Sequence, residues 1–276
     1  MLNKIKLKKI KKNINQIIAL TEKNLKLNLR FKITFIATLL APLFSIIMPM
    51  IIMSKFFAYS HEFGTWTADN LFLFQLLAFN VYLLIEIIYN YGNIIFREKF
   101  WNTLPLLVIS PINRFNILLS IFLTRLIIIA IPFTILFILC YLISPISLIT
   151  IFSIIILYFL IAIIFSGVGL ILAILIISKE SIFKALEFAI LFTFIISCIT
   201  YPYEIFPTSI QIIINLNPFY YIFDILRLVW IENNLIISIT SHPIHFIILI
   251  ISSLSFPWIG IYIFNYIFKK YGIVGY

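Results

Sequence analysis

Charged residues are scarce in this chain of 276 residues: only 11% of them are charged, while 63% are hydrophobic. A soluble globular protein carries about 25% charged residues, and a mean hydropathy of +1.15 is too high for a chain that must hide its apolar surface from water. Composition therefore excludes a soluble enzyme, a secreted disulfide scaffold and a disordered chain. The seven glycines exclude a collagen-like chain. The two cysteines, Cys140 and Cys198, lie in apolar runs, where we expect them to be buried.

Catalytic and nucleotide-binding motifs are also missing. The sequence has no G-x-x-x-x-G-K-[ST] phosphate-binding loop, no H-E-x-x-H, no G-x-S-x-G and no paired cysteine motif. We therefore predict that this chain has no catalytic residue, binds no metal or cofactor and does not hydrolyse ATP. A metal site at His242 and His245, which flank Pro243, would need a carboxylate such as Glu232. We interpret both histidines as interfacial polar residues.

Long apolar runs are what the sequence has in place of charge. A membrane-spanning helix needs about 20 apolar residues, and six runs approach or exceed that length. They predict an all-α polytopic membrane protein with six transmembrane helices. The predicted spans are Ile33–Met53, Asn70–Tyr91, Asn116–Ile143, Leu148–Ile177, Lys184–Thr200 and Pro243–Phe268.

The uneven distribution of Lys and Arg predicts the orientation of the spans. These residues gather in residues 1–32, in the connections after the second and fourth spans, and in the tail at 269–276. The opposite side holds only Lys55 and Arg227. We therefore expect a multi-pass plasma-membrane protein with both termini in the cytoplasm and no cleaved signal peptide. We assign the net charge of +10 to orientation and to contact with membrane lipids, and we expect no nucleic-acid partner.

The basic segment at 1–32 precedes the predicted transmembrane domain at 33–268. Within it, apolar residues recur at helical spacing, and the lysines lie mostly elsewhere around the helix. The recurring positions are Ile10, Ile14, Ile17, Ile18, Thr21, Leu25 and Leu29. This pattern predicts an amphipathic helix in the cytoplasmic interface. The helix is either a plain membrane anchor or a lever that leads into the first span and contacts a cytoplasmic partner.

Two connections are the longest in the chain: a cytoplasmic loop at 92–115 and an outer segment at 201–242. Neither is long enough for a soluble catalytic domain. The outer segment is rich in apolar residues and is interrupted by Pro202, Pro207 and Pro218. This composition favours short re-entrant helices between spans five and six.

A few residues inside the predicted spans stand out from their apolar surroundings. Glu86 in the second span and Arg125 in the third are costly in lipid. Because these spans are adjacent and antiparallel, the two charges lie at comparable depths, and we predict a structural ion pair between them. A proton relay is disfavoured, since it would need more intramembrane carboxylates. Gly169 and Ala173 form a small-xxx-small pair, which permits close helix approach.

The cytoplasmic loop carries a characteristic series of residues: Arg97, Glu98, Thr103, Leu104, Leu107, Ser110, Pro111 and Arg114. This series resembles the loop after the second span in type-2 ATP-binding-cassette (ABC) exporter permeases, where the family reads R-E-x-x-x-G-T-L-E-x-L-L, followed by S/T-P and a basic residue. We therefore term it the coupling loop. Asn102 and Pro105 depart from the pattern, where the family has Gly and Glu. Proline is tolerated only in the first turn of a helix, so a coupling helix would have to begin near Pro105.

The outer segment resembles the same family between spans five and six, where a Pro-rich stretch leads to N-P and then to D-x-x-R. Glu204 lies in the Pro-rich stretch. The N-P and D-x-x-R parts of the pattern are matched by Pro218, Asp224 and Arg227. By resemblance these four residues belong to an outer gate that caps the transport path. Asp224 and Arg227 are about one helical turn apart and can pair. The resemblance covers essentially the whole chain.

The resemblance implies a transport subunit that is not an enzyme. Two copies, as a homodimer or as a heterodimer with a related permease, would dock on separate ATPase subunits, which bind ATP and Mg²⁺. The matching residues of the coupling loop, together with Trp101, would contact the ATPase beside the N-terminal helix. ATP-driven closure would then move a hydrophobic or amphipathic substrate outward, such as a drug, a lipid or a lipid-linked glycan. The alternatives are an ATP-independent carrier and a membrane assembly scaffold, and dependence on an ATPase partner distinguishes them.

Overall fold

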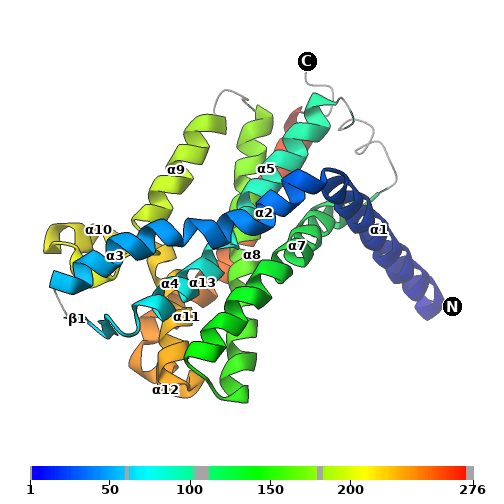
Figure 1. The fold of residues 1–276 in the computed structure, drawn as a ribbon. Coiled ribbons are helices and arrows are strands. Elements are labelled where there is room, and N and C mark those ends of the chain that lie inside the picture. The colour runs from blue at the N-terminus through cyan, green and yellow to red at the C-terminus, as the bar shows by residue number, and fades with distance from the viewer. Residues whose placement is uncertain (1, 60–61, 102, 104–111, 179–182, 272–276) are drawn as a thin grey trace.

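The described part of the chain is almost entirely helical (Figure 1). The computed structural model describes residues 2–59, 62–101, 103, 112–178 and 183–271. The helices are α1 (Leu2–Arg30), α2 (Lys32–Ser45), α3 (Ile47–Tyr59), α4 (Leu71–Tyr82), α5 (Ile85–Phe100), α7 (Arg114–Ile143), α8 (Leu148–Ser178), α9 (Phe183–Ile195), α10 (Thr208–Leu216), α11 (Pro218–Glu232), α12 (Leu235–Ser241) and α13 (Pro243–Tyr271), with one 3-10 helix, η2 (Tyr203–Ile205). The strands β1 (Glu62–Phe63) and β2 (Trp66–Thr67) form a small antiparallel hairpin.

Four helical stretches are long and apolar enough to cross a membrane: Leu71–Glu98, formed by α4 and α5, then Phe115–Ile143, Leu148–Leu175 and Pro243–Tyr266. Helices α10 and α11, which meet at an angle of 93°, make a fifth candidate as a broken span or a re-entrant loop. The fold is therefore that of a polytopic, mostly helical membrane protein. The six-span count is not confirmed among the described residues.

The first and fifth predicted spans are shorter helices than the sequence predicted. The run Ile33–Met53 forms parts of α2 and α3, which are separated at Ile46. Pro49 lies in the first turn of α3 and has no backbone N–H, so a continuous helix would leave the carbonyl of Ser45 unpaired. The fifth span corresponds to α9, which has 13 residues. Beyond its end, Cys198 adopts a φ of 53°, a left-handed conformation that does not continue a helix.

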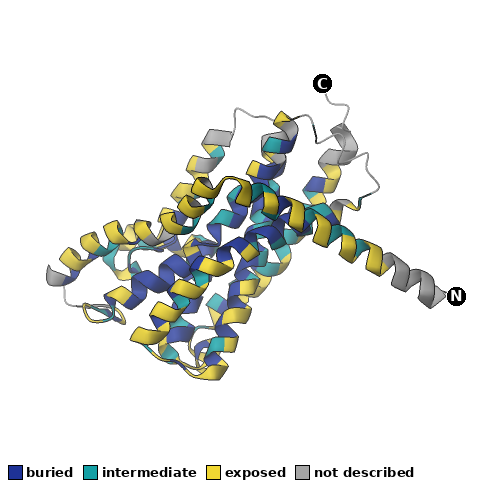
Figure 2. Cartoon of the chain, turned by 45° about the vertical axis from the view of Figure 1, so that its right-hand side comes forward, coloured by how far each residue is buried: buried dark blue, intermediate teal, exposed yellow. Residues whose placement is uncertain are grey.

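Helices α4 and α5 form the centre of the bundle. Most of α4 is buried, and α5 packs against α7 and α8, while α8 also packs along α13. The outward sides of α7, α8 and α13 expose large apolar residues (Figure 2), as expected of helices that contact lipid. Helix α1 lies along the beginning of α7, next to the end of α5 (Figure 1).

Glycines allow α8 to approach both of its neighbours closely. An added Cβ on Gly167 would meet backbone atoms of Phe256 and Pro257 in α13 at 2.4 Å. On Gly169 it would lie 3.0 Å from the Cα of Ile88 in α5. The packing role predicted for Gly169 is thus found, and Ala173, one turn further along, is fully buried. The contact at Gly167 was not predicted, because no small-xxx-small partner marks it.

Candidate functional site

Glu98 joins α1 to the end of α5. Nζ of Lys23 in α1 donates to Oε1 of Glu98 over 2.9 Å, and the Glu98 side chain is only 6% exposed. Thr103 folds back onto the same residue: its backbone N–H donates to the Glu98 carbonyl at 2.9 Å, and its hydroxyl donates to Oε2 of the carboxylate. Glu98 therefore holds both α1 and the chain that leaves α5.

Asn116 makes a second attachment between α1 and the bundle, at the beginning of α7. Its side-chain amide donates to Oε1 of Gln16 at 2.8 Å and to Oδ1 of Asn13 at 3.3 Å. The face of α1 that packs on the bundle also buries Thr21 and Asn24. The first part of the predicted coupling loop at 92–115 is helical, because α5 continues to Phe100. Helix α1 is thus bonded to the end of α5, within the coupling loop, and to the start of α7 just after it. We term these contacts the α1 junction.

The remaining predicted coupling residues lie close to the α1 junction or outside the described residues. The guanidinium of Arg97 lies 5.4 Å from the centre of the Trp101 ring, a cation–π contact, and Trp101 is 51% exposed. Arg114 is the first residue of α7. Leu104, Leu107 and Pro111 fall outside the described residues.

Glu86 and Arg125 contact each other as an ion pair between α5 and α7, as the sequence predicted. The Arg125 side chain is buried, whereas that of Glu86 is 42% exposed. Two side chains of α5 also bond to backbone carbonyls of α7: the amide of Asn90 donates to Ile121 and the hydroxyl of Tyr91 donates to Leu118. The ion pair therefore belongs to a polar seam that fixes α5 against α7.

Arg227 in α11 is almost fully buried, and its principal partners are backbone carbonyls. Its Nη1 donates to the carbonyl of Cys198 at 3.0 Å, and its Nη2 donates to the carbonyl of Ile199. Its guanidinium also lies 3.8 Å from the centre of the Phe74 ring. The predicted pair with Asp224 is present but long, with 3.8 Å between Nη1 and Oδ1.

Two more side chains bind the same stretch of backbone. Asn217 caps α11 by accepting from the N–H of Phe219, and its amide donates to the carbonyl of Thr193 at 3.1 Å. Gln75 in α4 donates to the carbonyl of Thr200 at 2.8 Å. Side chains of α4 and α11 thus bind one carbonyl in the last turn of α9 and three carbonyls in the chain just beyond its end. We term these contacts, together with those of Arg227, the α9 clamp.

Both acidic residues of α11 contact histidines, and the contact of Asp224 with His245 was not predicted from the sequence. Nε2 of His245 lies 3.4 Å from Oδ2 of Asp224, and Nε2 of His242 lies 3.2 Å from Oε1 of Glu232. Both histidines are close to the beginning of α13, so they join α13 to α11. Throughout the described ranges, no group of three or more His, Cys, Asp or Glu residues is arranged to hold a metal ion.

Glu204 and Pro218 occupy different parts of the outer segment. Pro218 is the first residue of α11, where its missing N–H is tolerated. Glu204 lies in η2 against the hairpin, where Gly64 has a φ of 62° and an added Cβ would come within 2.4 Å of Oε1 of Glu204. Desolvation in this contact raises the pKa of the Glu204 carboxyl above its ordinary value. Glu204 is nevertheless near enough to Asp224 and Arg227 for their charges to act on its carboxyl, so these three predicted gate residues lie in one region.

In a comparison with known protein families, one family model matches most of the chain. The family model for the ABC-2 type transporter matches residues 15–230, which include all of the α1 junction except Asn13, the ion pair of Glu86 with Arg125 and the α9 clamp. No curated protein matches the chain. A match over more than half of the chain makes it a membrane transport subunit of the ABC class, a kind of subunit that is generally not catalytic itself. The chain belongs to the ABC-2 type transporter family.

Proposed function

We propose that this chain is the permease subunit of an ATP-driven exporter in the plasma membrane, with both termini in the cytoplasm. A separate ATPase subunit binds ATP and Mg²⁺, and this chain binds neither. The α1 junction is the observation that carries the proposal, because it ties the N-terminal helix to both ends of the coupling loop. The same loop carries the family's R-E and T-L residues, beginning at Arg97.

The arrangement suits the transmission of force. An ATPase that pushes on the coupling loop acts on α5 through Glu98 and on α7 through the segment that begins at Asn113. Because α1 is bonded to both helices, it moves with them. Alternating access requires only that these helices have two alternative packings and that the nucleotide state of the ATPase favours one or the other.

The outer segment caps the path, and a second permease completes it. Helices α10 and α11 bend sharply toward one another and lie at the end of α9. Helix α9 exposes the large apolar side chains of Phe188, Leu191, Phe192 and Ile195. We assign this apolar side to the path or to the second copy, which is identical or related. Apolar walls suit a hydrophobic or amphipathic substrate such as a drug, a lipid or a lipid-linked glycan.

Photocrosslinking in native membranes tests the proposal. A photoreactive amino acid replaces Trp101, which lies in the coupling loop and is 51% exposed. The matched control replaces Trp258 of α13, which is 69% exposed on the apolar surface of the bundle. We expect the probe at position 101 to capture a soluble protein with a phosphate-binding loop, identified by mass spectrometry, and the probe at 258 to capture none.

ATPase activity gives the second readout. The captured protein, purified with the permease, is expected to change its rate of ATP hydrolysis when hydrophobic substrates are added. If position 101 captures only lipids and unrelated membrane proteins, the ABC exporter assignment is wrong and an ATP-independent carrier is favoured. If an ATPase is captured but its turnover never responds to any substrate, an assembly scaffold is favoured.

A further inference from the structure

Helix α1 presents three different surfaces around its axis. One flank packs on the bundle and buries polar residues, including Thr21 and Asn24. The edge next to it is apolar and exposed: Ile10, Ile14 and Ile18 follow one another at four-residue spacing and are each about half exposed. The helix therefore turns polar side chains toward the protein and leaves isoleucines uncovered, which is the arrangement of a helix whose apolar edge lies in a lipid layer.

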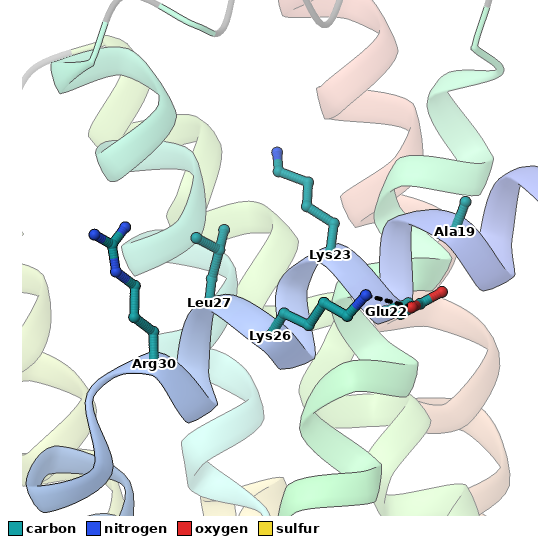
Figure 3. Close-up of a pocket in the computed structure, with 6 residues that line it drawn as sticks. All are labelled: Ala19, Glu22, Lys23, Lys26, Leu27 and Arg30. Atoms are coloured by element: carbon teal, nitrogen blue, oxygen red, sulfur yellow. Dashed lines mark ion pairs between the residues drawn. The ribbon is translucent and has the colours of Figure 1, made fainter.

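The third surface is a basic groove along α1, and Lys23, which bonds to Glu98 of the bundle, lies in its wall. The groove has a volume of about 580 Å³, and Lys23, Leu27 and Arg30 extend to the same side of α1 along it (Figure 3). Its described lining residues are Ala19, Glu22, Lys23, Lys26, Leu27 and Arg30. Three cations and one carboxylate thus line a space that adjoins the exposed apolar edge.

The cations of the groove keep donors to spare. Nζ of Lys26 pairs with Glu22 at 2.6 Å, and this contact lowers the pKa of the Glu22 carboxyl. Nζ of Lys23 pairs with Glu98. Each lysine ammonium has three N–H donors and the Arg30 guanidinium has five, so these pairs use only part of the capacity. The groove retains a net positive charge.

We propose that this groove binds the phosphate of an anionic phospholipid headgroup, while Ile10, Ile14 and Ile18 enter the acyl layer of the same leaflet. Charge complementarity favours a phosphate, and the continuity of the groove with an apolar edge favours a lipid as its source. Leu27 and Ala19 offer apolar contact to the glycerol region. The inference rests on the proposed function only for the identity of the leaflet, which is the cytoplasmic one.

The site has a consequence for the α1 junction, because Lys23 belongs to both. Its ammonium group lines the groove and bonds to Glu98 at the end of α5. A headgroup phosphate in the groove contacts Lys23, Lys26 and Arg30 together. These contacts fix the side of α1 that lies next to the coupling loop. Anionic lipid therefore stabilises the α1 junction.

Native mass spectrometry of the full chain tests the site. The protein is titrated in detergent with phosphatidylglycerol or with phosphatidylcholine, and the occupancy of bound lipid is counted. The test variant carries Lys26→Ala and Arg30→Ala. The control carries Lys11→Ala and Lys12→Ala, which removes the same charge from exposed positions of the same helix outside the groove.

We expect the groove variant to bind phosphatidylglycerol about tenfold more weakly, because each basic residue contributes substantially to anionic lipid binding, and the control to stay within twofold of the unmodified chain. Glu22→Gln removes the competing carboxylate and is expected to strengthen binding. Equal losses in both double variants would mean that the basic segment attracts lipid without a site. No loss in either, or equal binding of phosphatidylcholine, would also overturn the proposal.

The readout separates this inference from the proposed function. Lipid occupancy is measured without an ATPase, whereas the exporter assignment depends on the crosslink from position 101. Failure of that crosslink with intact lipid selectivity would overturn the exporter assignment and leave the headgroup site. Loss of selectivity with a successful crosslink would overturn the headgroup site alone.

Discussion

The α1 junction and the α9 clamp both bind segments far apart in sequence, but they use different partners. In the junction, side chains bond to side chains: Lys23 to Glu98, and Asn116 to Gln16. In the clamp, Arg227, Asn217 and Gln75 bond mainly to backbone carbonyls between Thr193 and Thr200.

The two sets of contacts differ in how easily water can replace them. The Lys23 side chain is 43% exposed, so water can take over its donors, and the buried Glu98 carboxylate keeps the Thr103 hydroxyl as a donor when Lys23 leaves. The Arg227 side chain is 2% exposed, and the carbonyls it binds have no helical partner, so losing them leaves buried groups unpaired. We infer that the junction can separate and re-form during a transport cycle, whereas the clamp keeps one geometry.

Arg227→Met should break the clamp and give the largest effect. The substitution keeps much of the side-chain volume but removes the donors to Cys198 and Ile199, and we expect the free energy of unfolding to fall by about 3 kcal/mol. Thermal unfolding in detergent measures it. Arg30→Met is the control, since Arg30 is exposed and should cost under about 0.5 kcal/mol. Equal midpoints for the two variants would contradict the clamp.

Asn217→Ala should weaken the clamp by a smaller amount. It removes the cap of α11 and the donor to the Thr193 carbonyl, and we expect a loss of about 1–2 kcal/mol in the same assay. Asn215→Ala removes an exposed amide whose bond is to the Tyr203 hydroxyl, and it should leave the midpoint nearly unchanged. A larger effect at 215 than at 217 would show that the cap is not what holds α9.

The α1 junction should show a smaller and salt-dependent energy. A double-mutant cycle of Lys23→Met and Glu98→Gln is expected to give a coupling energy of about 1 kcal/mol at low salt and less at 1 M salt. The effect of Arg227→Met should change much less with salt, because its principal partners are uncharged carbonyls and its site, which includes the long pair with Asp224, is buried. A coupling energy that does not change with salt would mean that the junction, like the clamp, keeps one geometry, and it would contradict the distinction between them.

Glu22→Gln should give the smallest effect on stability. The pair with Lys26 is exposed, and Lys26 lowers the pKa of Glu22. For a carboxyl with a lowered pKa, the contribution to stability is complete above its ordinary pKa and is lost as pH falls through the lowered value. Any difference in melting between Glu22→Gln and the unmodified chain should therefore be small and the same from pH 6 to pH 8. A pH-dependent difference in that window would mean that Glu22 has another partner.

The sequence by itself determined the membrane class, the helical content and the family motifs. Apolar runs and the scarcity of charge act locally, and they need no knowledge of which helix packs on which. The contact of Glu86 with Arg125 was also predictable, because two charges at similar depth in adjacent antiparallel helices have few other partners in lipid.

Only the tertiary structure decided the partners in the junction and the clamp. Asp224 is the charged residue nearest to Arg227 in sequence, yet Arg227 bonds to carbonyls of Cys198 and Ile199, and Asp224 lies closer to His245. Lys23 and Glu98 are 75 positions apart. Partners of this kind are set by which donors and acceptors remain unpaired once the helices break and pack. That outcome depends on the whole bundle, whereas hydropathy and helical period are properties of short stretches of chain.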